Sequence, residues 1–146
     1  MNKILVAVDK SNQSVKAASI GIEIASKMNA DIAFVYVIDA TLAMGNIDAG
    51  ITPEQAKIVL IKEAEETLDE LVGQHKNDLS IHRFMPEGNP SEEILSSALS
   101  WSADLIVMGT HGRHGLKHLL MGSIAEDVLR HTPIPVLVVP LKLQTD

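Results

Sequence analysis

Short, continuous apolar runs that alternate with longer amphipathic segments limit this chain to few folds. The first run, Ile4–Val8, contains no polar residue, which is typical of a strand buried on both faces of a parallel sheet. The next run lies at residues 31–38, and the segment between the two has apolar residues at helical spacing as far as Met28. Because strand–helix–strand units have a right-handed crossover, we expect the two strands to be parallel neighbours.

Two capping signals predict where further helices begin. Thr52 precedes Pro53 and Gln55, an arrangement in which Thr52 is the N-cap and Gln55 completes a capping box. A long helix is expected to follow. Asn89–Pro90 is a similar signal and predicts a helix over residues 91–100.

The remaining segments continue the alternation of strands and helices. Residues 79–85 alternate with polar side chains, as an edge strand would, whereas residues 104–108 have the composition of a buried strand. A helix over about residues 123–131 leads to a final apolar run at residues 136–139. Five strands alternating with four helices predict a three-layer α/β/α sandwich, in which residues 1–146 form a single domain.

Composition and charge exclude several classes of function. The chain has no cysteine, which rules out disulfides, thiolate catalysis and cysteine-type zinc sites and fits a reducing compartment. A net charge of -7 argues against a surface that coats nucleic acid or binds an anionic membrane. No stretch approaches the roughly 20 apolar residues that span a bilayer, and the N-terminal apolar run is too short for a signal peptide. We therefore expect a cytoplasmic protein that binds neither nucleic acid nor membrane.

A glycine-rich segment after the fourth predicted strand carries the strongest functional signal. Gly109 and Gly112 follow that strand, and Gly122–Ser123 precedes the next helix. Ligands of open parallel sheets bind at the carboxyl ends of the strands. Glycines there let backbone N–H groups approach a phosphate, and the helix N-terminus with the Ser123 hydroxyl favours an anion. Each glycine alone could be a flexible connection, but the set favours phosphate binding; it is neither a Walker P-loop nor a dinucleotide fingerprint.

The spacing Gly109-x-x-Gly112, nine residues, then Gly122-Ser123 resembles the ATP-binding signature of the universal stress protein family. The resemblance extends in order over nearly the whole chain, in segments 4–11, 35–38, 88–94, 103–109 and 133–139. It implies a Rossmann-like, adenine nucleotide alpha hydrolase-like fold with strand order 3-2-1-4-5 and a switch point between the first and fourth strands.

The resemblance also implies how ATP is held. Four residues are implied to hold the phosphates: Gly109, Gly112, Gly122 and Ser123. Asp9 is implied to lie against the ribose and phosphates, and the backbone of Val37 to meet adenine. The sequence pattern itself supports part of this implied site. Asp9 and Val37 end adjacent predicted strands, and the ends of these strands face the same crevice as Gly109. The family further implies a homodimer in which Val136–Val139 pairs across a two-fold axis.

Asp9 and the basic residues of the glycine-rich segment each allow a second interpretation. A carboxylate at the end of a strand often only caps the following turn. Beside phosphates it would repel them unless a cation such as Mg²⁺ or Mn²⁺ intervened. Five basic residues cluster in the glycine-rich segment: His111, Arg113, His114, Lys117 and His118. A metal site is one hypothesis for them, but the cluster contains no Asp or Glu, so positive charge that assists the phosphates is favoured.

ATP binding does not imply ATP hydrolysis. A hydrolase needs an oriented water and charge stabilisation on the γ-phosphate, and no residue of the sequence is identified for either task. We therefore assign no catalytic residue. The favoured function is a nucleotide-responsive regulator of the stress response, which acts as a homodimer on an unidentified protein partner. A slow Mg-dependent ATPase and a nucleotide-free adaptor remain alternatives.

Three smaller expectations concern loops and single residues. Residues 40–52, with Met44, are expected to be mobile and partly disordered, a lid over the nucleotide being the alternative. Trp101 is expected to pack rather than to bind a ligand. Asp39 and Asp48 have no identifiable partner and are expected to be solvated.

Overall fold

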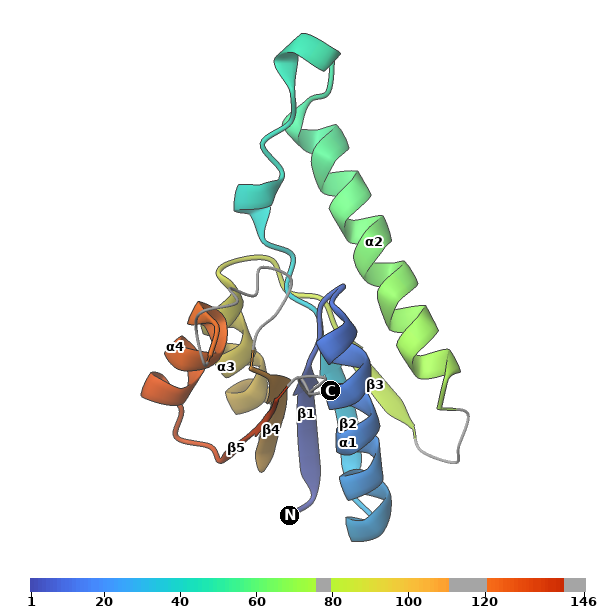
Figure 1. Cartoon of the computed structure of the whole chain (residues 1–146), viewed down its shortest axis with the longest axis vertical. Helices are drawn as coiled ribbons and strands as arrows, with labels where there is room; N and C mark the ends of the chain where they lie inside the picture. The colour runs from blue at the N-terminus through green and yellow to red at the C-terminus, as the bar shows by residue number, and fades with distance from the viewer. Residues whose placement is uncertain (76–79, 111–120, 141–146) are drawn as a thin grey trace, which may run out of the picture.

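A twisted parallel sheet forms the centre of the computed structural model, which describes residues 1–75, 80–110 and 121–140 (Figure 1). Its strands are β1 (Lys3–Ala7), β2 (Asp31–Val35), β3 (Ile81–Phe84), β4 (Leu105–Gly109) and β5 (Val136–Val139). They lie in the order β3-β2-β1-β4-β5, and every neighbouring pair is parallel. The predicted strand order and the edge position of the third strand are confirmed.

Two helices cover each face of the sheet. The helices are α1 (Asn12–Met28), α2 (Pro53–Gly73), α3 (Pro90–Trp101) and α4 (Ser123–His131). One core cluster holds buried residues of α1 and α2, and the other holds buried residues of α3 and α4. Figure 1 shows these pairs on opposite sides of the sheet. The three-layer α/β/α sandwich is therefore confirmed.

The central strands are apolar throughout because both of their faces are buried. Ile4 and Val6 belong to the cluster beneath α1 and α2, whereas Leu5, between them in sequence, belongs to the cluster beneath α3 and α4. All three side chains are fully buried. Alternate residues of one strand thus supply both cores, so the run cannot alternate between apolar and polar residues.

Local capping places the starts of two helices where the sequence predicts them. The Gln55 N–H donates to Thr52 Oγ1 at 3.2 Å, and the Thr52 N–H donates to Gln55 Oε1 at 2.9 Å, which completes the capping box at α2. The Glu92 N–H donates to Asn89 Oδ1 at 3.1 Å at the start of α3. These bonds satisfy backbone donors that no carbonyl of the helix can reach.

Residues 40–52 differ from the partly disordered connection that the sequence predicts. They form two short 3-10 turns, η1 (Ala40–Leu42) and η2 (Ile47–Ala49). Asp39 caps the first turn and Asn46 the second through their side-chain oxygens. In Figure 1 the segment and the first half of α2 extend away from the sheet. We call this projection, residues 40–59, the arm.

Trp101 packs against its neighbours, as expected, at the end of the sheet where the strands begin. Its ring meets Phe84 edge-on at a centroid distance of 5.8 Å, and Lys3 Nζ lies 5.4 Å from the ring centroid. No helix in the described ranges combines the length and apolar character that crossing a membrane requires.

Candidate functional site

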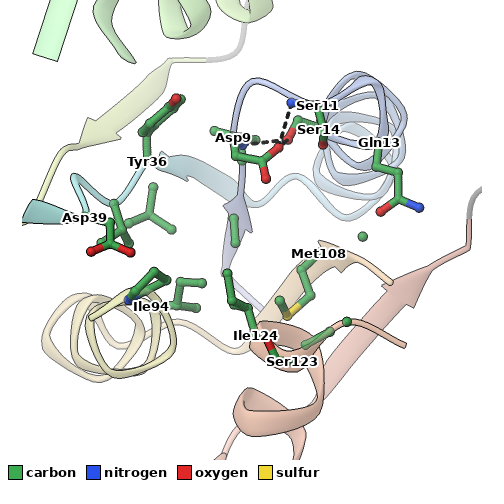
Figure 2. A pocket seen from close by; sticks show the side chains of 18 of the residues that line it. Asp9, Ser11, Gln13, Ser14, Tyr36, Asp39, Ile94, Met108, Ser123 and Ile124 are labelled. Carbon is green, nitrogen blue, oxygen red and sulfur yellow. Dashed lines mark hydrogen bonds between the residues drawn. The ribbon is translucent and has the colours of Figure 1, made fainter. Parts of the chain in front are cut away.

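A cavity of about 230 Å³ opens at the carboxyl ends of β1, β2 and β4. Its walls come from the turn after β1, the segment after β2, the end of β4 and the starts of α3 and α4. Figure 2 shows Asp39 and Tyr36 on the side of the cavity opposite Gln13, with Met108 and Ser123 from the β4–α4 side below. This is the switch point of the sheet, where ligands of such folds bind.

Five of the six predicted ligand-binding residues line this cavity: Asp9, Val37, Gly109, Gly122 and Ser123. The sixth, Gly112, lies outside the described residues, as do the five basic residues that cluster near it. The structure thus brings together residues from three distant parts of the sequence. Their roles in binding remain predictions.

The backbone of Val37 presents an unpaired donor and acceptor at this edge. On one side, the Tyr36 and Ile38 N–H groups donate to carbonyls of the β3 segment at 2.9 and 2.8 Å. The carbonyl of Val35 faces the other way and accepts from Val8 N–H at 2.9 Å. Alternate residues of a strand face the same neighbour, so Val37 faces the β1 side, where the chain has already turned away at Asp9. Among the described residues, nothing bonds to the Val37 N–H or carbonyl.

Two helices begin at the cavity without a side-chain cap. Ser11, the N-cap residue of α1, makes no capping bond, and its buried Oγ has no hydrogen-bond partner within the described part of the chain. Gly122, the N-cap of α4, has no side chain with which to cap. The two helices that begin with a capped N-terminus, α2 and α3, use Thr52 and Asn89 for this purpose. The cavity therefore collects free backbone N–H groups and the positive ends of two helix dipoles.

Asp9 caps the turn after β1, and its role beside a ligand stays a prediction. Its Oδ1 accepts from the Ser11 N–H at 2.8 Å and from Ser14 Oγ at 2.9 Å, while its own N–H donates to Ser14 Oγ at 2.6 Å. These bonds close the turn between β1 and α1, as Figure 2 shows. The same carboxylate lines the cavity. Capping the turn fixes the carboxylate beside the position where a ligand would lie.

Gly109 is required by close packing against α1. A Cβ at this position would lie 2.6 Å from Gln13 Oε1 and 3.0 Å from Gln13 Cβ. Gln13 is 5% exposed and donates from Nε2 to Thr110 Oγ1 at 3.2 Å. The Thr110 carbonyl in turn accepts from the Gly122 N–H at 2.6 Å, which joins the two ends of the glycine-rich segment.

The universal stress protein family model matches residues 1–140 of this chain. The chain belongs to the universal stress protein family. Universal stress protein MJ0531 of Methanocaldococcus jannaschii is 38% identical over 138 residues, which cover 94% of this chain and 81% of that protein.

Two solved structures have the same fold. Protein MJ0577 of M. jannaschii superposes with a TM-score of 0.87 at 26% identity, over 98% of each chain. A universal stress protein from Archaeoglobus fulgidus in complex with dAMP has a TM-score of 0.64 at 24% identity, over 94% of this chain and 97% of that one.

Several residues that line the cavity of this universal stress protein were missed from the sequence. Asp39 was expected to be solvated without a partner; instead it caps η1 and lines the cavity. The sequence did carry a signal, because Asp39 is two residues after Val37 and so continues the same side of the chain. Other missed lining residues are Ser11, Gln13, Leu42, Leu60, Ile94, Met108, Thr110 and Ile124.

The charge of the described cavity wall is negative. Asp9 and Asp39 are its acidic side chains, and no Lys, Arg or His of the described residues lines it. Within the same part of the chain, no group of three or more His, Cys, Asp or Glu side chains could hold a metal ion. The described donors at the cavity include the backbone N–H groups at the starts of α1 and α4.

Proposed function

We propose that this protein binds ATP in the cavity at the carboxyl end of the sheet. The observation that carries the proposal is the pairing of two features in one cavity. The first is the free donor and acceptor of the Val37 backbone; the second is the pair of helix N-termini that begin without a side-chain cap. The first suits the edge of a base, and the second suits phosphates.

The shape and lining of the cavity fit the parts of a nucleotide. Apolar side chains from different elements, among them Leu60, Ile94 and Met108, offer surface for a flat ring. Asp9 lies between the strand ends and the start of α1, where a carboxylate accepts hydrogen bonds from ribose hydroxyls. The A. fulgidus protein with dAMP shares the fold alone at its level of identity. The residues of this chain therefore carry the proposal of a nucleotide ligand.

A divalent cation fits beside the phosphates. Asp9 places a carboxylate at the cavity, which the starts of α1 and α4 also line. Mg²⁺ or Mn²⁺ commonly binds nucleotides through phosphate oxygens and one or two protein carboxylates. Asp9 is the residue that would hold such an ion, which would neutralise part of the phosphate charge.

The regulatory part of the proposal rests on the arm. Leu42 of the arm and Leu60, directly after it, line the cavity, so a bound nucleotide would contact the arm from below. The arm exposes large apolar side chains to solvent: Met44 is 79% and Ile47 is 95% exposed. ATP occupancy would act by favouring one arrangement of the arm or of a homodimer that a protein partner recognises.

Calorimetric titration with ATP and Mg²⁺ tests the binding site directly. Gly122 has φ -72° and ψ 162°, which valine adopts easily, so Gly122→Val should fold and block the approach of phosphates to the start of α4. We expect the nucleotide-stripped wild type to bind ATP with a micromolar dissociation constant. Gly122→Val should bind ATP at least about tenfold more weakly than the wild type does.

Gly73→Val is the matched control. A Cβ at Gly73 meets nothing within 4 Å, at the far end of α2, so ATP should bind this variant as it binds the wild type. Absence of ATP binding to the wild type would contradict the proposal. Release of ADP during the titration would favour the slow ATPase over the regulator.

A further inference from the structure

We propose that the Asp39 carboxylate recognises the exocyclic amino group of the base, so that this residue selects adenine over 6-oxo purines. The inference rests on the proposed nucleotide site and assigns a side chain that adds to the base specificity of the Val37 backbone. Asp39 is among the residues that line the cavity, and Figure 2 shows it beside Ile94, on the side opposite Gln13.

Successive side chains after β2 point to opposite faces of the sheet, and this alternation sets the direction of the Asp39 side chain. Tyr36 and Ile38 pack in the core cluster beneath α1 and α2, whereas Val35 and Val37 pack on the side of α3 and α4. Asp39 continues the side of Val37. Its carboxylate therefore lies on the same side of the chain as the Val37 side chain, and both residues line the cavity.

The turn that follows fixes the Asp39 carboxylate through only one of its two oxygens. Asp39 Oδ1 accepts from the Thr41 N–H at 3.0 Å and from Thr41 Oγ1 at 2.6 Å. No hydrogen bond or ion pair involves Oδ2 among the residues that the structure describes. One oxygen thus holds the side chain in place, and the other remains an acceptor for a ligand.

The amino group of adenine has two donor hydrogens, which match the two acceptors of this arrangement. It carries two hydrogens, one for the Val37 carbonyl and one for Asp39 Oδ2, while the Val37 N–H faces the adjacent ring nitrogen. Hypoxanthine and guanine place a carbonyl oxygen where adenine has the amino group. That oxygen would face both the Asp39 carboxylate and the Val37 carbonyl with no hydrogen between them, and the protonated ring nitrogen beside it would face the Val37 N–H. All of these contacts are repulsive. Sites built to hydrogen-bond one ligand group reject analogues that lack it more strongly than apolar pockets do.

The test compares ATP with ITP, which differ at this position of the base. Wild-type protein, Asp39→Asn and the control Asp48→Asn are titrated with each nucleotide. The amide side chain in Asp39→Asn keeps an oxygen for the Thr41 turn but presents an NH₂ group in place of the second oxygen, so it no longer repels a base carbonyl. Asp48→Asn removes the same charge from the exposed turn η2, away from the cavity. We expect the wild type and Asp48→Asn to prefer ATP over ITP by about tenfold or more. Asp39→Asn should keep only the part of that preference that the Val37 backbone sets, so its ATP-to-ITP affinity ratio should fall several-fold.

The ratio of the two affinities separates recognition from simple charge. Loss of a negative charge alone would strengthen the binding of ATP and ITP equally. An unchanged ATP-to-ITP affinity ratio in Asp39→Asn therefore overturns the inference, while the ATP site stands. Equal binding of ATP and ITP by the wild type also overturns it. Failure of the wild type to bind either nucleotide overturns the proposed function and this inference together. Thr41→Val, outside the cavity, removes one donor that holds Asp39 and should lower the ratio in the same direction.

Discussion

At the scale of single residues, Gly21 shows how tightly α1 lies on the sheet. A Cβ at Gly21 would lie 2.5 Å from Val6 Cγ2, a fully buried atom of β1 that has no room to move. We expect Gly21→Ala to lower the free energy of unfolding by about 1–3 kcal/mol, because the helix must shift outward. Urea unfolding followed by circular dichroism measures this change.

Gly73→Ala is the control for the same substitution in an open position. Nothing lies within 4 Å of a Cβ at Gly73, in the last turn of α2. Alanine favours the helix there, so we expect this variant to be unchanged or more stable by up to about 1 kcal/mol. Equal effects of the two substitutions would contradict the packing argument at Gly21.

At the scale of elements, Asp104 ties the start of β4 to the start of β1. Its Oδ2 accepts from the Asn2 N–H at 2.7 Å and the Lys3 N–H at 3.0 Å, and these two bonds hold the pKa of Asp104 below its usual value of 3.8. A lowered pKa means that the ionised form stabilises the fold; the contribution is complete above 3.8 and is lost as the pH falls through the lowered value. We expect Asp104→Asn to be less stable than the wild type at neutral pH, with the difference shrinking in acid. Urea unfolding at both pH values checks this; a difference independent of pH would contradict it.

What the sequence could predict at this scale depends on how local the cause is. The capping bonds at Thr52 and Asn89 span three residues, so the starts of α2 and α3 are visible in the sequence. The end of β2 is not visible there. Its pairing with β1 stops at Val35 because β1 turns away at Asp9, although bonds to the β3 segment continue to Ile38. The turn at Asp9 is distant in sequence from the end of β2, so the local sequence of β2 does not predict where the strand ends.

The same distinction holds for the candidate site. The glycine signature is contiguous enough to be read directly, and its described members do line the cavity. Gln13 was missed because its significance comes from Thr110, which is 97 residues away in sequence. Asp39 was missed because its side chain acts through a turn that the sequence predicts to be disordered.

At the scale of the whole molecule, the open edge of β5 is the surface that the proposed homodimer would use. The Pro135 and Val139 carbonyls accept from Ile106 and Thr110 at 3.0 and 3.1 Å, so these alternate residues face β4. By the same alternation, the N–H and carbonyl groups of Val136 and Val138 face the open edge, and such an edge can pair with a second chain.

Val138→Pro tests this surface without touching the ladder to β4. Proline removes the N–H that faces the open edge, and edge strands tolerate proline. Light scattering should give a dimer for the wild type and a monomer for Val138→Pro. Val138→Thr keeps both the N–H and the branched shape, so it should remain a dimer. Val138 does not line the cavity, so ATP binding should survive in the monomer and separate the ligand site from the assembly. A monomeric wild type would contradict the homodimer, and a dimeric Val138→Pro would place the interface elsewhere.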